Sequence, residues 1–283
     1  MTNILKAIRN LILEHDVHVG EVRESNNRAN SLGEAFEVYI KNVFAGAFGL
    51  AGTAYQKKIE EAFSYQGSAS KPPDLMIRGG DAIEIKKLQT RDSQIQLNSS
   101  FPKNKLHADD SRVAAEAKKA EAWTEKDILY VVGNVDSKAK TVKSMWWIYG
   151  DCFCADASVY QRVSRKISAA LTQIEDLDFS PTNELGRING VDAQRFTDLR
   201  IRGMWLLKNP HKVFEGYASI DKYAKFQLFV LMQEEKWKSF PQEDRVLIEK
   251  LMKSGVLEMT LEKVANPDNP AQSLNCRLIK FTI

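Results

Sequence analysis

Apolar side chains recur at helical spacing near the start of the chain. Within residues 3–14 they fall on one face of an amphipathic helix, at Ile4, Leu5, Ile8, Leu11 and Ile12. A second helix is predicted to begin at Ser31, which we interpret as its N-cap with Glu34 three residues later. Its apolar face would carry Phe36, Tyr39, Ile40, Val43 and Phe44.

A different pattern follows in the middle of the chain. Residues 67–73 are rich in small residues and proline and indicate a loop. Residues 75–78 and 82–88 are mostly apolar and flank Gly79-Gly80, which predicts a β-hairpin. Further buried strands are predicted over 127–133 and 144–149, with helices over 111–123 and 157–174. Strands flanked by helices indicate an α/β fold.

The last hundred residues differ in character. Residues 180–184 resemble a linker, residues 197–207 predict a strand, and residues 219–255 predict a mostly helical region. We therefore expect a core over residues 1–179 and a C-terminal region over residues 180–283, unless the two form one continuous domain.

Composition excludes several classes of protein. No apolar run approaches the roughly 20 residues that a membrane span needs, and the first residues reach charge too early for a signal peptide, so we expect a cytoplasmic protein with no membrane partner. The formal net charge is only +3, so affinity for nucleic acid would depend on local basic clusters. Two such clusters are Arg162, Arg165 and Lys166, and Arg187, Arg195, Arg200 and Arg202.

The predicted hairpin carries the chemistry of interest. Asp74 precedes its first strand, and Glu84 and Lys86 lie in the second. Side chains alternate across a strand, so Glu84 and Lys86 share one face while Ile85 occupies the other. Taken alone, this pattern also fits a solvent-exposed ion pair.

The glycine turn favours convergence over an exposed ion pair. Antiparallel pairing across it would bring Asp74 beside the end of the second strand that carries Glu84 and Lys86. Two carboxylates beside an amine suit a hard cation such as Mg²⁺ and phosphodiester hydrolysis. Lys86 would either orient and help deprotonate an attacking water or stabilise the transition state.

Pro73-Asp74, followed ten residues later by Glu84-x-Lys86, resembles the PD-(D/E)xK nuclease signature. Residues 97–103, 199–205 and 266–270 extend the resemblance to the NgoPII family of type II restriction endonucleases. The resemblance implies a restriction-endonuclease-like core with a mixed sheet flanked by helices. It also implies Mg²⁺-dependent cleavage of both strands of double-stranded DNA at a short palindrome, with GGCC the first sequence to test.

The resemblance also implies partners and further site residues. A homodimer would match the two-fold symmetry of the site, and a cognate DNA methyltransferase would be the genetic partner. The C-terminal region over residues 180–283 would then serve DNA recognition, dimerisation or both. Many such nucleases add a glutamate from a preceding helix, for which we favour Glu37 over Glu34. The predicted catalytic residues are therefore Asp74, Glu84, Lys86 and Glu37, and the predicted metal ligands are Asp74, Glu84 and Ile85.

Two segments could contact the DNA. Asn and Gln suit adenine, whereas Arg and Lys suit guanine. The polar loop after the catalytic strand offers Gln94, Gln96, Asn98, Ser99, Ser100 and Lys103. Strand alternation places Arg200 and Arg202 on one face, where they would read guanines or clamp phosphates, or else pair with Asp192 and Asp198.

Two other functions stay open at this point. A structure-selective repair or recombination nuclease could use the same carboxylates without reading sequence. A DNA-binding protein without catalysis could hold them for structural reasons alone. Discrete cleavage of plasmid DNA would separate a restriction enzyme from both.

Overall fold

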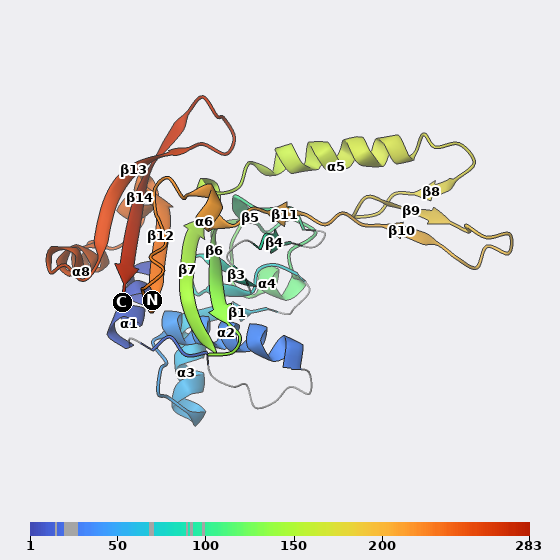
Figure 1. Ribbon diagram of the computed structural model, residues 1–283. Coiled ribbons are helices and arrows are strands. Elements are labelled where there is room, and N and C mark those ends of the chain that lie inside the picture. Colours follow the sequence, from blue (N-terminus) through green and yellow to red (C-terminus); the bar gives the residue numbers. More distant parts are fainter. Residues whose placement is uncertain (15, 20–27, 68–70, 89, 91–92, 98–99) are drawn as a thin grey trace.

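A nine-stranded sheet forms the centre of the molecule (Figure 1). The computed structural model describes residues 1–14, 16–19, 28–67, 71–88, 90, 93–97 and 100–283. The strand order is β1-β2-β3-β6-β7-β12-β14-β13, with β5 also paired to β6. Their bounds are β1 Phe63–Gln66, β2 Leu75–Ile77, β3 Ala82–Leu88, β5 Lys105–His107, β6 Glu125–Asp136, β7 Thr141–Tyr149, β12 Gln227–Gln233, β13 Glu258–Ala265 and β14 Ser273–Thr282.

The sheet is mixed. Strand β3 pairs parallel with β6 and β7 pairs parallel with β12, whereas the β2–β3, β6–β7 and β12–β14 pairs are antiparallel. The helices are α1 Ile4–Glu14, α2 Arg28–Ala45, α3 Gly52–Ala62, α4 Ala115–Lys119, α5 Ala157–Leu171, α6 Pro210–Val213, α7 Glu234–Ser239 and α8 Gln242–Lys253. The predicted α/β fold with a mixed sheet flanked by helices is confirmed.

Helix α2 is held close to the central strands. Phe36 and Phe44 on its apolar face are fully buried, and the Phe44 ring lies 5.2 Å from that of Trp147 on β7, measured between centroids. Phe36 lies over Gly133 of β6, where the first carbon of any side chain would come within 2.1 Å of the ring. Glycine at this position therefore lets α2 approach the sheet closely.

Most of the predicted N-terminal elements are confirmed. The α1 helix and the β2–β3 hairpin lie where the pattern predicts them, and α2 begins at Arg28, so Ser31 is inside the helix and not at its N-cap. The helix predicted over 111–123 is wrong in extent, since only Ala115–Lys119 is helical. The Asp110 carboxylate accepts the Arg112 N–H, and the Ala114 N–H donates to the carbonyl of Pro72, so these donors are used outside the helix.

The C-terminal region is less helical than predicted. Residues 219–255 contain helices α7 and α8, but Gln227–Gln233 is strand β12, buried between β7 and β14. A short, continuously apolar run has no periodicity that separates a buried strand from a helix, which explains the error. The strand predicted over 197–207 is divided into β10, Leu199–Ile201, and β11, Leu206–Leu207.

The part of the chain that follows β7 and precedes β12 forms an arm that extends from the body (Figure 1). It consists of α5 and a three-stranded sheet of β8 Asp178–Ser180, β9 Gly186–Asn189 and β10. Of the linker predicted over residues 180–184, residue 180 ends β8 and residues 181–184 lie in the connection between β8 and β9 of this sheet. Strand β11 returns to the body and pairs with β4, Ile95–Gln96. The boundary predicted at residues 179 and 180 stays a prediction.

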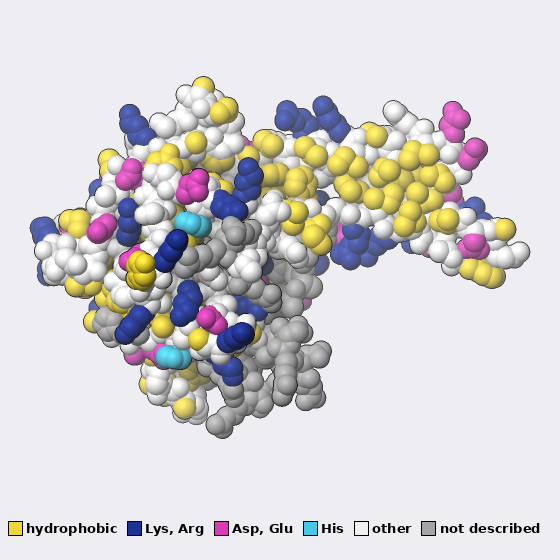
Figure 2. All heavy atoms as spheres, in the orientation of Figure 1, with side chains coloured by type: hydrophobic (Ala, Val, Ile, Leu, Met, Phe, Trp, Pro, Cys, Tyr) yellow, Lys and Arg dark blue, Asp and Glu magenta, His cyan; other side chains and the backbone are white. Residues whose placement is uncertain are grey.

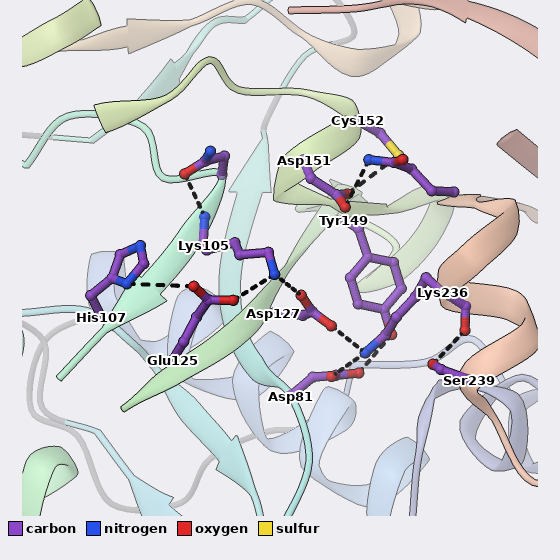
Figure 3. Close-up of polar contacts among 12 residues, drawn as sticks. Asp81, Lys105, His107, Glu125, Asp127, Tyr149, Asp151, Cys152, Lys236 and Ser239 are labelled. Carbon is purple, nitrogen blue, oxygen red and sulfur yellow. Dashed lines mark hydrogen bonds and ion pairs between the residues drawn. The ribbon is translucent and has the colours of Figure 1, made fainter. Parts of the chain in front are cut away.

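A charged network fastens α7 to the sheet (Figure 3). Lys236 lies 2.6 Å from carboxylate oxygens of both Asp81 and Asp127. The Tyr149 hydroxyl donates to Asp81 as well, and Asp127 also faces Lys105. These contacts join the starts of β3 and β6 and the end of β7 to α7.

The cysteines and the helices bear on the class of protein. Cys152, Cys154 and Cys276 are free and buried. None of the helices in the described residues has both the length and the apolar character needed to cross a membrane.

Candidate active site

The β2–β3 hairpin brings Asp74, Glu84 and Lys86 together. The Ile85 N–H donates to Oδ2 of Asp74 at 2.6 Å, which fixes this carboxylate against the second strand. The ammonium nitrogen of Lys86 lies 2.7 Å from Oε1 of Glu84 and 3.9 Å from Oδ2 of Asp74. The convergence expected from the glycine turn is therefore present, and the ion pair is not a solvent-exposed one, because Glu84 is only 9% exposed.

This cluster carries unbalanced negative charge. Burial and the neighbouring Glu84 carboxylate raise the pKa of Asp74 to about 7, against the opposing influence of Lys86 and the Ile85 N–H. Burial opposes the charge on Lys86, but Glu84 and Asp74 outweigh it and raise the pKa of the ammonium above its usual value. Lys86 is therefore a cation at neutral pH, which favours transition-state stabilisation over proton abstraction for this residue.

Glu37 adds a third carboxylate from helix α2. Its charge acts on both Asp74 and Lys86, so it belongs to the same electrostatic cluster. Burial raises the pKa of Glu37, partly offset by Lys41 and Lys86. Glu34, the other predicted candidate, is exposed one turn earlier. This placement favours Glu37 over Glu34.

The cluster opens into a cavity of about 320 Å³. Its walls come from segments far apart in the chain, including Asp74, Glu84, Lys86, Gln96, Arg200 and Arg202. The β2–β3 hairpin, strand β4 and the base of the arm therefore share one opening. A phosphodiester in this cavity would lie between carboxylates and guanidinium groups.

The donor set fits a divalent cation. Oε2 of Glu84 is buried and has no hydrogen-bond partner, an unusual state for a carboxylate oxygen that a cation would relieve. Asp74 supplies a second carboxylate. The backbone N–H and carbonyl of one strand residue point to the same side, so the Ile85 carbonyl faces the side on which its N–H meets Asp74. No group of three His, Cys, Asp or Glu side chains in the described part of the chain could hold a metal ion. The fit is therefore to hard oxygen donors from two carboxylates and a carbonyl, with water and phosphate completing the shell.

The predicted DNA-binding loop is only partly aligned with the cavity. Gln96 is exposed in β4 and lines the cavity, as does Ser100, whereas Gln94 is exposed beside β4. Asn98 and Ser99 lie outside the described residues. Lys103 also lines the cavity but is 5% exposed, and its ammonium lies 2.5 Å from Asp110. Direct DNA contact by Lys103 would require that pair to open.

Arg200 and Arg202 lie side by side on one carboxylate. Their Nε atoms each lie 2.9 Å from a different oxygen of Glu184, and both side chains remain more than half exposed, at 61% and 57%. The acidic partners considered from the sequence have other roles. Asp198 pairs with Arg187, and Asp192 accepts backbone N–H groups of the loop before β10.

Sequence reasoning misses several residues of the cavity wall. Its patterns place Glu184 in a linker, Arg112 in a helix and Tyr130 in a buried strand, but all three line the cavity. No local pattern marks them, because each reaches the site through contacts between distant segments. Lys71 is the most accessible clue, since it directly precedes Pro72-Pro73-Asp74 and also lines the cavity.

Comparison with known proteins gives a consistent result. A family model described as NgoPII restriction endonuclease matches residues 2–265. The chain is 42% identical over 279 residues to the type II restriction enzyme NgoPII of Neisseria gonorrhoeae, covering 99% of each chain. No solved structure matched the chain.

Proposed function

The chain belongs to the NgoPII restriction endonuclease family, and from this premise we propose that it cuts double-stranded DNA at a short palindrome in a Mg²⁺-dependent reaction. The membership confirms the resemblance seen in the sequence and makes the protein a type II site-specific deoxyribonuclease. The observation that carries the chemical assignment is the buried cluster of Asp74, Glu84 and Lys86 at the cavity, with one Glu84 oxygen unpartnered.

Asp74, Glu84 and the Ile85 carbonyl would hold Mg²⁺. The cation supplies positive charge against the charge that develops on the phosphate during hydrolysis. Lys86 donates hydrogen bonds to the scissile phosphate or to the attacking water, and its raised pKa keeps it able to do so at neutral pH. Glu37 adds negative charge behind this group and helps to orient water on the side of α2.

Arg200 and Arg202 supply the recognition side of the cavity. Held in parallel on Glu184 at the wall of the cavity, they would bind a phosphate or a guanine edge. Gln96 of β4 and Ser100 line the same cavity. GGCC is the first sequence to test, and its support is the family membership alone.

Two partners complete the proposal. A type II enzyme that cuts both strands of a palindrome works as a homodimer whose two-fold axis matches that of the site. A cognate DNA methyltransferase would protect the same sequence in the cytoplasm of the host. That relation is genetic and requires no contact between the two proteins.

Digestion of a sequenced plasmid tests the proposal. With Mg²⁺ we expect discrete bands whose mapped ends share one short palindrome, and with EDTA no cleavage. Glu84→Ala should abolish cutting while leaving specific DNA binding measurable in Ca²⁺. A smear, or cleavage only at junctions, would contradict site-specific cleavage, and wild-type cutting by Glu84→Ala would overturn the site assignment.

A further inference from the structure

The arm carries an exposed apolar face on helix α5. Helix α5 has no buried residue along its whole length, although an isolated helix of 15 residues is marginally stable in water. Val163 and Ile167, one turn apart on α5, are each 42% exposed. Figure 2 shows hydrophobic side chains gathered over the arm on the face turned to the viewer.

The small sheet of the arm is also two-faced. Its register places Phe179, Ile188 and Leu199 opposite one another on one face, and Leu199 is 52% exposed. The same register places Arg187 opposite Arg200 on the other face. Arg200 lines the active-site cavity, so the arm turns a basic face to the DNA site. On the opposite, apolar face Ile188 of the central strand β9 is only 9% exposed, so Leu199 of the edge strand β10 is the residue that is open to solvent.

Basic and acidic side chains lie at different ends of the arm. Arg162, Arg165 and Lys166 lie along α5, whereas Glu175 and Asp176 follow its end at the tip of the arm. All five are exposed, and none forms an ion pair with another described residue. In Figure 2, basic side chains lie on the upper edge of the arm nearer the body and acidic ones at its tip.

A two-fold axis across the arm would place this basic group against the acidic tip of a second copy. Parallel pairing would instead oppose like charges. In such an isologous contact each copy presents the same surface to the other, so the basic group on each α5 faces the acidic tip of the other copy. The pattern therefore fits a second copy of this chain better than an unrelated partner.

We propose that two copies associate through the apolar faces of their arms, running antiparallel, with Val163, Ile167 and Leu199 in the buried centre. The inference rests on the proposed function, which requires two copies of the chain, and adds the surface through which they associate. It assigns the interface to α5 and its small sheet. The two bodies lie at opposite ends of the paired arms.

Analytical ultracentrifugation without DNA tests the interface. The molar mass measured for the wild type should be twice the 32.0 kDa of one chain. Ile167→Glu should raise the dissociation constant at least 100-fold, because it buries a charge at the centre of the interface. Leu261→Glu is the matched control, since Leu261 on β13 is 61% exposed and lies outside the arm. A monomeric wild type, or a dimeric Ile167→Glu variant, would overturn the proposal.

Charge exchange gives a second, independent measurement. Arg165→Glu with Lys166→Glu forms one variant, and Glu175→Lys with Asp176→Asn the other; Asn suits position 176 because its φ is 62°. Each variant alone should dimerise about tenfold more weakly. Mixing the two should restore the wild-type affinity, because acidic α5 then faces a basic tip and basic α5 an acidic tip. No recovery on mixing would refute the proposed pairing.

The outcome separates this inference from the proposed function. If the wild type cuts DNA with Mg²⁺ but is monomeric, or if the Ile167→Glu variant is still dimeric, the proposed interface is wrong and the proposed function stands. A dimer that loses association with Ile167→Glu but cuts no DNA would remove the function and leave the interface.

Discussion

Asp74 lies in surroundings that oppose its own charge. Burial and Glu84 raise its pKa to about 7, and only Lys86 and the Ile85 N–H oppose that change. The folded chain thus holds two carboxylates at a cost, which a bound cation would offset. The unfavourable free energy of holding these two carboxylates together is what we expect at a metal-binding site without its metal.

Asp74→Asn should therefore stabilise the metal-free protein at high pH. A carboxyl whose folded pKa is raised binds its proton more tightly when folded, so wild-type stability falls as pH rises from about 4 to about 7. Asn removes that loss. In EDTA we expect the variant to exceed the wild type by on the order of 2 kcal/mol at pH 8, with the difference vanishing near pH 4, measured by urea unfolding.

Added Mg²⁺ is the control for that experiment. It should stabilise the wild type and have little effect on Asp74→Asn, since a ligand that binds only the folded state raises its stability. A variant that is less stable than the wild type at pH 8 in EDTA would show that Asp74 serves mainly as a structural hydrogen-bond acceptor for Ile85.

Glu184 should act as a positioning residue for the two arginines. Glu184→Ala frees Arg200 and Arg202 from their parallel arrangement, so we expect the dissociation constant for the cleaved sequence to rise about tenfold in Ca²⁺, as for the loss of a base contact. Binding to unrelated DNA should hold or strengthen, because two cations lose their carboxylate. The ratio of the two constants is the measurement.

Asp198→Ala provides a matched comparison. Asp198 pairs with Arg187 in the same small sheet, and that pair is half-exposed. This variant should leave the ratio unchanged. An unchanged ratio for Glu184→Ala as well would mean that Arg200 and Arg202 contribute no specificity.

The residues of the site differ in how far the sequence could predict them. Asp74, Glu84 and Lys86 follow from strand alternation and one glycine turn, which are local. The partners of Lys103 and Arg200 could not be predicted, because Asp110 and Glu184 reach them through a loop and an arm whose folds depend on distant contacts.

At the scale of elements, periodicity succeeded for helices with one exposed face, and the Gly79-Gly80 turn identified the β2–β3 hairpin although its strands are buried on both faces. Helices α1, α2 and α5 and the β2–β3 hairpin were predicted close to their bounds. It failed for β12, which is buried on both sides, and for α4, whose neighbouring donors are used by Asp110 and Pro72. Both failures arise from tertiary contacts that leave no local signal.

Lys236→Met should loosen α7 from the sheet. The variant keeps the length of the side chain but leaves Asp81 without its cation and Asp127 with Lys105 alone (Figure 3). We expect the free energy of unfolding to fall by about 2–3 kcal/mol at pH 7, because breaking a largely buried pair strands the remaining charges. Urea unfolding measures it.

The pH dependence identifies the cause. Burial opposes the charge of Asp127, but Lys236 outweighs it and lowers the pKa of that carboxyl. The stabilisation is therefore complete near neutral pH and is lost as pH falls below about 4, where the variant should approach the wild type. Lys238→Met on the same helix, 61% exposed, should change stability by less than about 0.5 kcal/mol. An equal loss in both variants would point to helix propensity and away from the network.

For the whole molecule, the order of strands was beyond sequence reasoning. Strands β7 and β12 are parallel neighbours, yet the entire arm lies between them in the chain. The predicted C-terminal region therefore completes the sheet of the predicted core through β12, β13 and β14. Pairing over such separations depends on which apolar faces can be buried together, and no single segment encodes it.

A mixed dimer should cut only one strand. Each chain contributes one cluster of Asp74, Glu84 and Lys86, and a phosphodiester must be hydrolysed in each strand to break the duplex. A hybrid of one wild-type and one Glu84→Gln subunit, isolated through two different affinity tags, should convert supercoiled plasmid to nicked circles. A hybrid of wild type with Leu261→Glu should yield linear DNA, because both clusters are intact. Linear product from the Glu84→Gln hybrid would mean that one cluster serves both strands, and the dimer would then be required for recognition alone.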